Sequence, residues 1–261
     1  EMVAEVASRY DLNKPLLQQY TDWVFGITQG DLGDSLLFNR PVSKLLGNAL
    51  LPTIMLTSTS ITFSILIGLT FGIYSALNRN RIADHIVRIA TIFSVSMPGF
   101  WVAVVLILIF SVWLGLLPVA GYGGVQYIIL PAIALGLHTT ASITRIMRTS
   151  LLDTMEKPFV VFARAKGLSP RKVVFNHAWK NAFLPVLTVI GMSFGSLLAG
   201  SVVIESIFAW PGIGNLLIKA ISARDLVLIE STIMVIVFMF LVVNFVIDLL
   251  YHTIDPRITY E

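Results

Sequence analysis

The chain of 261 residues contains no cysteine and few charged residues. Without cysteine it forms neither a disulfide framework nor a thiolate metal site. Only 13% of the residues are Asp, Glu, Lys or Arg, whereas 56% are hydrophobic, and a soluble domain of this composition would have too little polar surface to stay in solution. The net charge of +3 is spread over connecting segments, so we expect no nucleic-acid partner.

Charge is also absent over long continuous stretches. Four apolar segments contain no Asp, Glu, Lys, Arg or His, and a fifth contains only His138. The five segments are Leu51–Leu77, Ile89–Leu117, Val119–Thr144, Ala182–Ile204 and Ser231–Ile247. A helix needs about 20 apolar residues to cross a bilayer core of roughly 30 Å. The sequence therefore predicts an all-α membrane protein with five spans, held in the lipid bilayer.

The basic residues indicate which side of the membrane each connection faces. Of the 18 Lys and Arg residues, 12 follow the first span, lie between Arg145 and Lys180, or stand at Arg257. The positive-inside rule then places the connection 145–183 and the tail 252–261 in the cytoplasm, with the membrane domain over 48–251. Residues 1–47 become an extracytoplasmic segment with short helices. Because that segment has to be exported, we expect a further first span upstream of this chain.

Small residues and one proline indicate that the spans pack against other helices. Gly68 and Gly72 form one small-residue face. Gly191, Gly195 and Ala199 form another, and such faces let helix backbones approach closely. Pro98 interrupts the second span. The proline is compatible with a simple kink and with a gating hinge, and the sequence alone does not separate the two.

The connection 145–183 carries the strongest local signal. Pro158 is suited to open a short helix ending at Lys166, and Gly167 is placed to end it with a left-handed cap. Ser169-Pro170 then predicts the start of a second helix that runs toward Phe183. The first helix offers an apolar surface flanked by basic residues. It suits docking into a groove on another protein, and an amphipathic helix lying on anionic lipid is the alternative.

The same connection resembles the cytoplasmic "EAA" loop of bacterial ABC-importer permeases of the oligopeptide, dipeptide and nickel group. The matching residues are Ala163, Arg164, Ala165, Lys166, Gly167, His177, Asn181, Leu184 and Pro185. Phe162 stands where that group usually has Ala, which makes it a candidate knob. Further matches are Ser96–Trp101, Gly121–Gly124, Glu205–Gly214, Arg224-Asp225, Asn244, Asp248 and the stretch 255–258. The resemblance covers almost the whole chain.

The resemblance implies a type I transmembrane domain of an ABC importer, in the bacterial inner (plasma) membrane, with six spans at full length. Such a permease is not an enzyme. It pairs with a second homologous permease, two cytoplasmic ATPase subunits and an extracytoplasmic solute-binding protein. ATP and Mg²⁺ then bind to the partner subunits, and this sequence contains no G-x-x-x-x-G-K-[ST] phosphate loop. The implied ATPase-coupling loop comprises Phe159, Phe162, Ala163, Arg164, Ala165, Lys166 and Gly167.

Two other functional classes are open to test. The stretch Gly191–Gly195 fits the G-x-S-x-G pattern of serine hydrolases, but it lies inside an apolar helix, so close helix packing is favoured. A secondary transporter or channel would work without an ATPase. The Ala163–Gly167 motif argues against that alternative, because a secondary transporter or channel would need no cytoplasmic docking element.

Four polar residues near or within the spans are candidates for the translocation path. His138 is an intramembrane titratable group and therefore a functional candidate, although a neutral histidine bonded to a neighbouring helix is the favoured interpretation. Glu205 is expected to border an outer vestibule or to contact the binding protein. Asn244 and Asp248 share one helix face near the inner end of the last span, where Asp248 caps, pairs with a loop arginine or borders the exit. No metal ligand set is apparent, yet the loops favour nickel or a metal chelate slightly over short peptides as the substrate.

Overall fold

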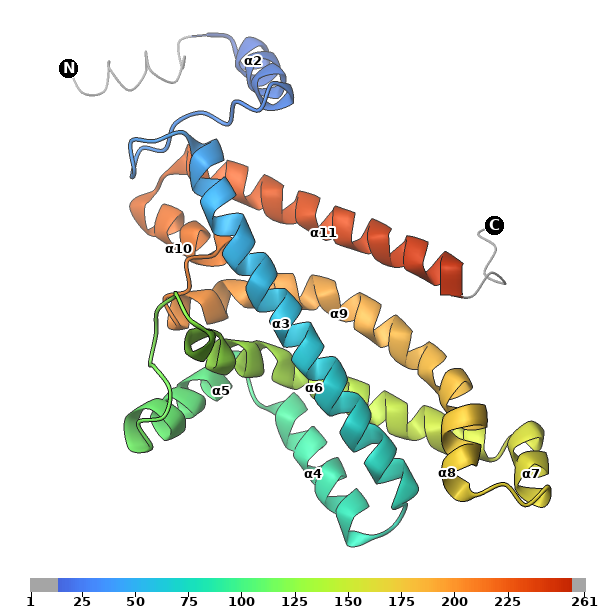
Figure 1. Ribbon diagram of the computed structural model, residues 1–261. Helices are drawn as coiled ribbons and strands as arrows, with labels where there is room; N and C mark the ends of the chain where they lie inside the picture. Colours follow the sequence, from blue (N-terminus) through green and yellow to red (C-terminus); the bar gives the residue numbers. More distant parts are fainter. Residues whose placement is uncertain (1–13, 255–261) are drawn as a thin grey trace.

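The computed structural model describes residues 14–254, and the regular structure in that range is helical (Figure 1). Residues 1–13 of the predicted outer segment and 255–261 of the predicted tail lie outside the described residues. The α-helices up to residue 155 are α2 (Leu16–Thr28), α3 (Val42–Leu77), α4 (Ile82–Ser96), α5 (Gly99–Leu106) and α6 (Val125–Met155). The later ones are α7 (Pro158–Ala165), α8 (Pro170–Lys172), α9 (Trp179–Ile207), α10 (Ile213–Ala223) and α11 (Leu226–Ile254). Two π-helical segments, η1 (Ile107–Trp113) and η2 (Val173–Ala178), continue α5 and precede α9.

Helices α3 and α6 run parallel at the centre of the bundle, and glycine allows their close approach. A Cβ atom on Gly68 would lie 2.7 Å from the side chain of Ile143, and one on Gly72 would lie 2.7 Å from that of Met147. The Ser64 hydroxyl also donates a 2.7 Å hydrogen bond to the carbonyl oxygen of Gly136. The predicted small-residue face on α3 is therefore confirmed, because any larger side chain there would force the helices apart.

The second predicted span is broken rather than straight. Helices α4 and α5 meet at Met97-Pro98 and differ in direction by 109°. Pro98 lacks an amide hydrogen and disfavours the helical conformation at the residue before it, and Met97 accordingly has an extended backbone. Within residues 14–254, four helices are long and apolar enough to cross a membrane, and the broken pair makes a fifth candidate span.

The helices extend beyond the uncharged segments that revealed them. Helix α6 continues through the basic stretch after Arg145 to Met155, and α3 begins at Val42, before the first uncharged segment. The predicted separate helix from Ser169-Pro170 to Phe183 is wrong in its end, because α8, η2 and α9 follow without interruption. Charge marks where apolar surroundings stop, whereas a helix ends only where its backbone hydrogen bonds are lost.

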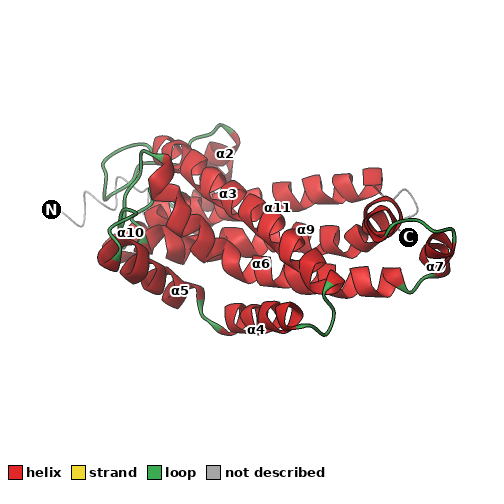
Figure 2. Ribbon diagram, turned by 60° about the horizontal axis from the view of Figure 1, so that its bottom comes forward, coloured by secondary structure: helices red, strands yellow, loops and turns green. Residues whose placement is uncertain are grey.

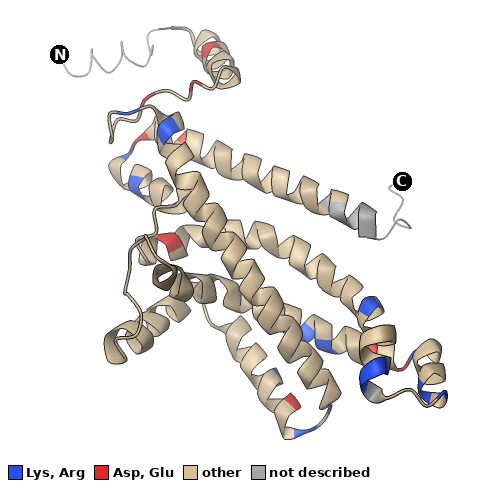
Figure 3. Cartoon of the chain, in the orientation of Figure 1, with Lys and Arg blue, Asp and Glu red and all other residues tan. Residues whose placement is uncertain are grey.

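The long helices give the molecule two distinct ends. Figure 2 shows α7 at one end of the bundle and α2 and α10 at the other. Figure 3 shows Lys and Arg gathered toward these ends, with long uncharged stretches between them. The end that carries α7 contains the connection 145–183, which the sequence assigns to the cytoplasm.

A buried ion pair fixes the turn between α3 and α4 at the α7 end. The Arg148 guanidinium on α6 donates two hydrogen bonds, of 2.7 and 2.8 Å, to the carboxylate of Asp84. The Ser75 hydroxyl and the Asn80 backbone amide donate to the same carboxylate. Asp84 has no exposed surface, so its charge is balanced by a bidentate arginine and two further donors.

Candidate functional site

Helix α7 is built as the sequence predicts. Pro158 occupies its first turn, and the Gly167 backbone, with a φ angle of +78°, donates a 2.9 Å hydrogen bond to the carbonyl oxygen of Arg164. A Cβ atom on Gly167 would meet no other atom within 4 Å. Glycine is therefore required for the left-handed backbone conformation and not for space.

One side of α7 is held by the bundle and the other is open. Val160 and Ala163 are buried in the same apolar cluster as Val173 and Val174 of η2. On the open side, Phe162 is 62% exposed, and the Lys166 ammonium lies 4.6 Å from the centre of its ring. The remaining members of the predicted coupling loop, Phe159, Arg164, Ala165 and Gly167, are also exposed. Ala163 alone of that set faces inward.

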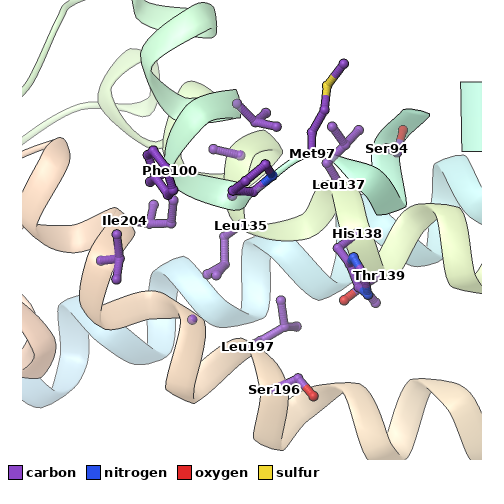
Figure 4. A pocket seen from close by; sticks show the side chains of 16 residues that line it. Ser94, Met97, Phe100, Leu135, Leu137, His138, Thr139, Ser196, Leu197 and Ile204 are labelled. Atoms are coloured by element: carbon purple, nitrogen blue, oxygen red, sulfur yellow. The ribbon is translucent and has the colours of Figure 1, made fainter. Parts of the chain in front are cut away.

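A cavity of about 420 Å³ lies where the α4–α5 break faces α6 and α9 (Figure 4). His138 on α6 lines it, together with the Met97–Phe100 stretch of the break. The polar side chains that line it are Ser94, His138, Thr139 and Ser196, and no Asp, Glu, Lys or Arg is among the described lining residues. The proline break and the intramembrane histidine, which are distant in the sequence, therefore line the same cavity.

Glu205 lies in a different place, buried between α3, α9 and the start of α10. Its carboxylate accepts a 2.7 Å hydrogen bond from the Thr53 hydroxyl and two more from the backbone amides of Gly214 and Asn215, at 2.7 and 3.1 Å. The residue has no exposed surface. These contacts give Glu205 a structural task, and its predicted role beside an outer vestibule stays a prediction.

The motif that follows Glu205 has a packing reason. A Cβ atom on Gly212 would collide with the Glu205 carboxylate, and one on Gly214 would collide with the backbone of Val202. Trp210 is buried, and its indole nitrogen donates a 2.9 Å hydrogen bond to the carbonyl oxygen of Pro52. The glycines therefore let α10 fold back tightly onto α9 and α3.

The last two predicted path residues lie on α11. The Asn244 side-chain amide donates a 2.8 Å hydrogen bond to the carbonyl oxygen of Phe240 on its own helix. Asp248 belongs to α11 by its backbone, and its side chain lies outside the described residues. Asn244 is not among the described residues that line the His138 cavity, and Glu205 is buried elsewhere, so the three path candidates with described side chains do not form a single cluster.

Several residues that organise these sites carry little recognisable signal in the sequence. Asp84 and Arg148 lie 64 positions apart and carry no local pattern that would pair them. Thr53 accepts a 2.8 Å hydrogen bond from the Ile213 backbone amide while donating to Glu205, and its threonine-rich surroundings gave no reason to select it. The one signal that could have identified Asp84 is its position as an isolated acid at the start of a hydrophobic helix.

Comparisons of sequence place the chain among membrane transport proteins. Residues 68–260 match the family described as "Binding-protein-dependent transport system inner membrane component". The chain is 37% identical over 261 residues to the Glutathione transport system permease protein GsiC of Salmonella choleraesuis, covering 100% of this chain and 85% of that protein. It is 39% identical over 289 residues to the Di/tripeptide transport system permease protein DppB of Pseudomonas aeruginosa, covering 100% and 86%.

Comparisons of structure agree on the fold. A chain of the inward-facing MetNI methionine ABC transporter superposes with a TM-score of 0.67 at 18% identity, covering 81% of this chain and 96% of that chain. A chain of an amino acid ABC transporter with histidines gives a TM-score of 0.64 at 16% identity, covering 81% and 94%. The fold is that of an ABC-importer transmembrane domain.

Proposed function

This chain belongs to the family of inner-membrane components of binding-protein-dependent transport systems, and we propose that it forms half of the path through which an ATP-driven importer takes up short peptides. It is a non-catalytic permease subunit of an ABC importer. We propose, in addition, the substrate of this importer, the residues that dock on the ATPase, the residues that line the path and the number of partner subunits.

Short peptides are favoured as the substrate by the names of the relatives. The two similar permeases described above belong to systems for glutathione and for di- and tripeptides, and glutathione is itself a tripeptide. The preference for nickel that the loops suggested finds no support in those names. Among the residues whose side chains the structure describes, no group of three or more His, Asp or Glu is placed to hold a metal ion.

The observation that carries the proposal is the half-open helix α7. Its inner side is fixed to the bundle through Val160 and Ala163, whereas Phe159, Val161 and Phe162 are 41 to 62% exposed. An apolar surface of this kind, at the end that the sequence assigns to the cytoplasm, suits a groove on an ATPase subunit. Because α7 packs against η2, which continues directly into α9, movement of a docked ATPase would be passed to the spans.

The cavity beside His138 is our candidate for part of the path. It lies at the broken span, where the bend leaves room between α4, α5, α6 and α9. Its described lining is uncharged, which suits a wall that lets a zwitterionic solute pass without holding it tightly. Selection then rests with an extracytoplasmic solute-binding protein.

Two experiments test the proposal. A thermal shift of the cognate solute-binding protein with dipeptides, tripeptides, glutathione and Ni²⁺ identifies the substrate, and we expect stabilisation by peptides. Stabilisation by Ni²⁺ alone would contradict the peptide assignment.

The second experiment tests the docking surface. A photoreactive amino acid at Phe162 should crosslink to the ATPase subunit in membranes. The same amino acid at Met192, which is 73% exposed within α9, is the control and should not. Equal crosslinking at both positions, or none at Phe162, would show that α7 does not bind the ATPase.

A further inference from the structure

A cleft of about 880 Å³ separates α2 from the first turns of α11 at the end of the bundle opposite α7. Figure 1 shows α2 set apart from the helices that form the bundle, beyond the N-terminal end of α11. The wall of the cleft is mainly apolar, with Gln19, Arg224 and Glu230 as its polar residues. Its apolar and aromatic residues are Leu16, Tyr20, Trp23, Leu36, Leu226, Val227, Ile233 and Met234. Neither the ATPase-coupling role nor the His138 cavity involves this cleft.

Helix α2 is poorly covered by its own chain. None of its residues is buried, and Leu16, Tyr20 and Phe25 are 84, 62 and 64% exposed. The rings of Tyr20 and Trp23 lie 6.2 Å apart. Neighbouring exposed apolar side chains of this kind mark a surface that contacts lipid or another protein. Tyrosine and tryptophan on an amphipathic helix are typical of the interface between lipid headgroups and acyl chains.

The apolar wall of the cleft continues directly along α11. Ile233, Val237 and Leu241 follow one another at intervals of four residues, so they form one stripe on the helix. Their side chains are 47, 51 and 58% exposed. A linear hydrocarbon chain that entered the cleft would therefore find continuous apolar surface on α11 as far as Leu241.

The cleft also contains one cation and one anion. Arg224 and Glu230 both line it and both are exposed, and neither side chain takes part in an ion pair with another described residue. The nearby acid Asp225 is already engaged, because it accepts hydrogen bonds from the Ser35 hydroxyl and the Leu37 amide. The two remaining charges complement a headgroup that carries both a phosphate and an ammonium group.

We propose that this cleft binds a phospholipid with a primary amine in its headgroup, from the membrane leaflet that adjoins α2. The lipid phosphate contacts Arg224, the ammonium group contacts Glu230, and one acyl chain lies along α11. The aromatic residues Tyr20 and Trp23 cover the junction between headgroup and chain. The inference does not depend on which solute the importer carries.

The proposal is tested by quenching of Trp23 fluorescence in nanodiscs that contain the full-length protein. Phosphatidylethanolamine, phosphatidylcholine and phosphatidylglycerol, each brominated on the same acyl chain, are added at equal mole fraction. The signal of Trp23 is the difference between the unmodified protein and Trp23→Phe. We expect about threefold stronger binding of phosphatidylethanolamine than of the other two lipids, the scale of exposed charge pairs.

Two variants test whether the preference for phosphatidylethanolamine depends on the contacts of its headgroup with Arg224 and Glu230. The double variant Arg224→Gln with Glu230→Gln should quench equally with all three lipids. Lys219→Gln, which removes an exposed charge on α10 outside the cleft, should keep the preference. Equal quenching of the unmodified protein by all three lipids would overturn the proposal, as would a preference that survives the double substitution. Absence of Trp23 quenching would show that protein covers the cleft, and would also overturn it.

Discussion

At the scale of single residues, Gly167 is the position where backbone conformation is expected to matter most for the proposed coupling to the ATPase. Its φ of +78° costs an L-amino acid about 1 kcal/mol or more, and a β-branched side chain adds to that cost. We expect Gly167→Val to insert normally, to alter the end of α7 and to lose ATP-driven uptake. Gly167→Asn tolerates the left-handed region better and should retain most uptake. Normal uptake by a stably inserted Gly167→Val protein would contradict the coupling role.

Variants of Glu205 can distinguish a structural role of this residue from a role in the translocation path. Replacing it with Leu would leave the Gly214 and Asn215 amides without an acceptor, at a cost of about 2 kcal/mol or more. Glu205→Gln keeps a carbonyl oxygen for the two amides and should lose less. The measurement is the thermal unfolding temperature in detergent, together with uptake. If Glu205→Gln abolished uptake without lowering that temperature, the residue would belong to the path.

At the scale of elements, the Asp84–Arg148 pair joins the α3–α4 turn to α6. Removing one partner of a buried ion pair costs about 3–5 kcal/mol, because the other charge is left uncompensated. We expect Arg148→Ala to lower thermal stability strongly. Arg79→Ala breaks the 3.1 Å contact with Glu156, whose side chains are 55 and 72% exposed, and should cost about 1 kcal/mol or less. Similar losses in the two variants would show that the buried pair does not hold the turn.

The placement of the two ends relative to the membrane is open to direct labelling. The chain lacks cysteine, so single cysteines at Asp34 and Arg171, both exposed, report separately on the two ends. An impermeant thiol reagent on intact cells should label position 34 and leave position 171 unlabelled until the membrane is opened. The reverse pattern would invert the topology.

The elements that the sequence predicted well are those with strong local rules. Uncharged stretches marked the spans, and Pro158 and Gly167 marked both ends of α7. The sequence could not give the 109° angle at Met97-Pro98, because a proline break permits a range of angles and packing selects one. It also missed that α8, η2 and α9 form one continuous element, since charge patterns locate the membrane boundary rather than the helix end.

The site was less predictable than the fold, since its parts come from distant segments. His138 and the 97–100 break share one cavity only because α6 and the bent pair pack together. Glu205 was selected for its charge near the outer end of a span, but the orientation that buries it depends on Thr53, 152 positions away. A single sequence shows which polar residues lie in apolar segments. It does not show whether such a side chain lines a cavity or is packed against other helices.

At the scale of the whole molecule, the chain has the surfaces of a subunit. In the proposed importer, the open side of α7 is the surface that docks on an ATPase subunit. The cavity at His138 opens at the surface of this chain and does not form a closed pore through it. Met192 and Val203 on α9 are exposed within a span, where a second permease would cover them. A single copy therefore leaves both the docking surface and the path incomplete.

The most direct test of the central claim is uptake of a radiolabelled dipeptide into proteoliposomes. The chain is reconstituted alone and together with its partner permease, ATPase subunits and solute-binding protein. We predict ATP-dependent, saturable uptake by the complete assembly and none by the chain alone. Saturable uptake by the chain alone without ATP would contradict the importer-subunit account and establish a secondary transporter in its place.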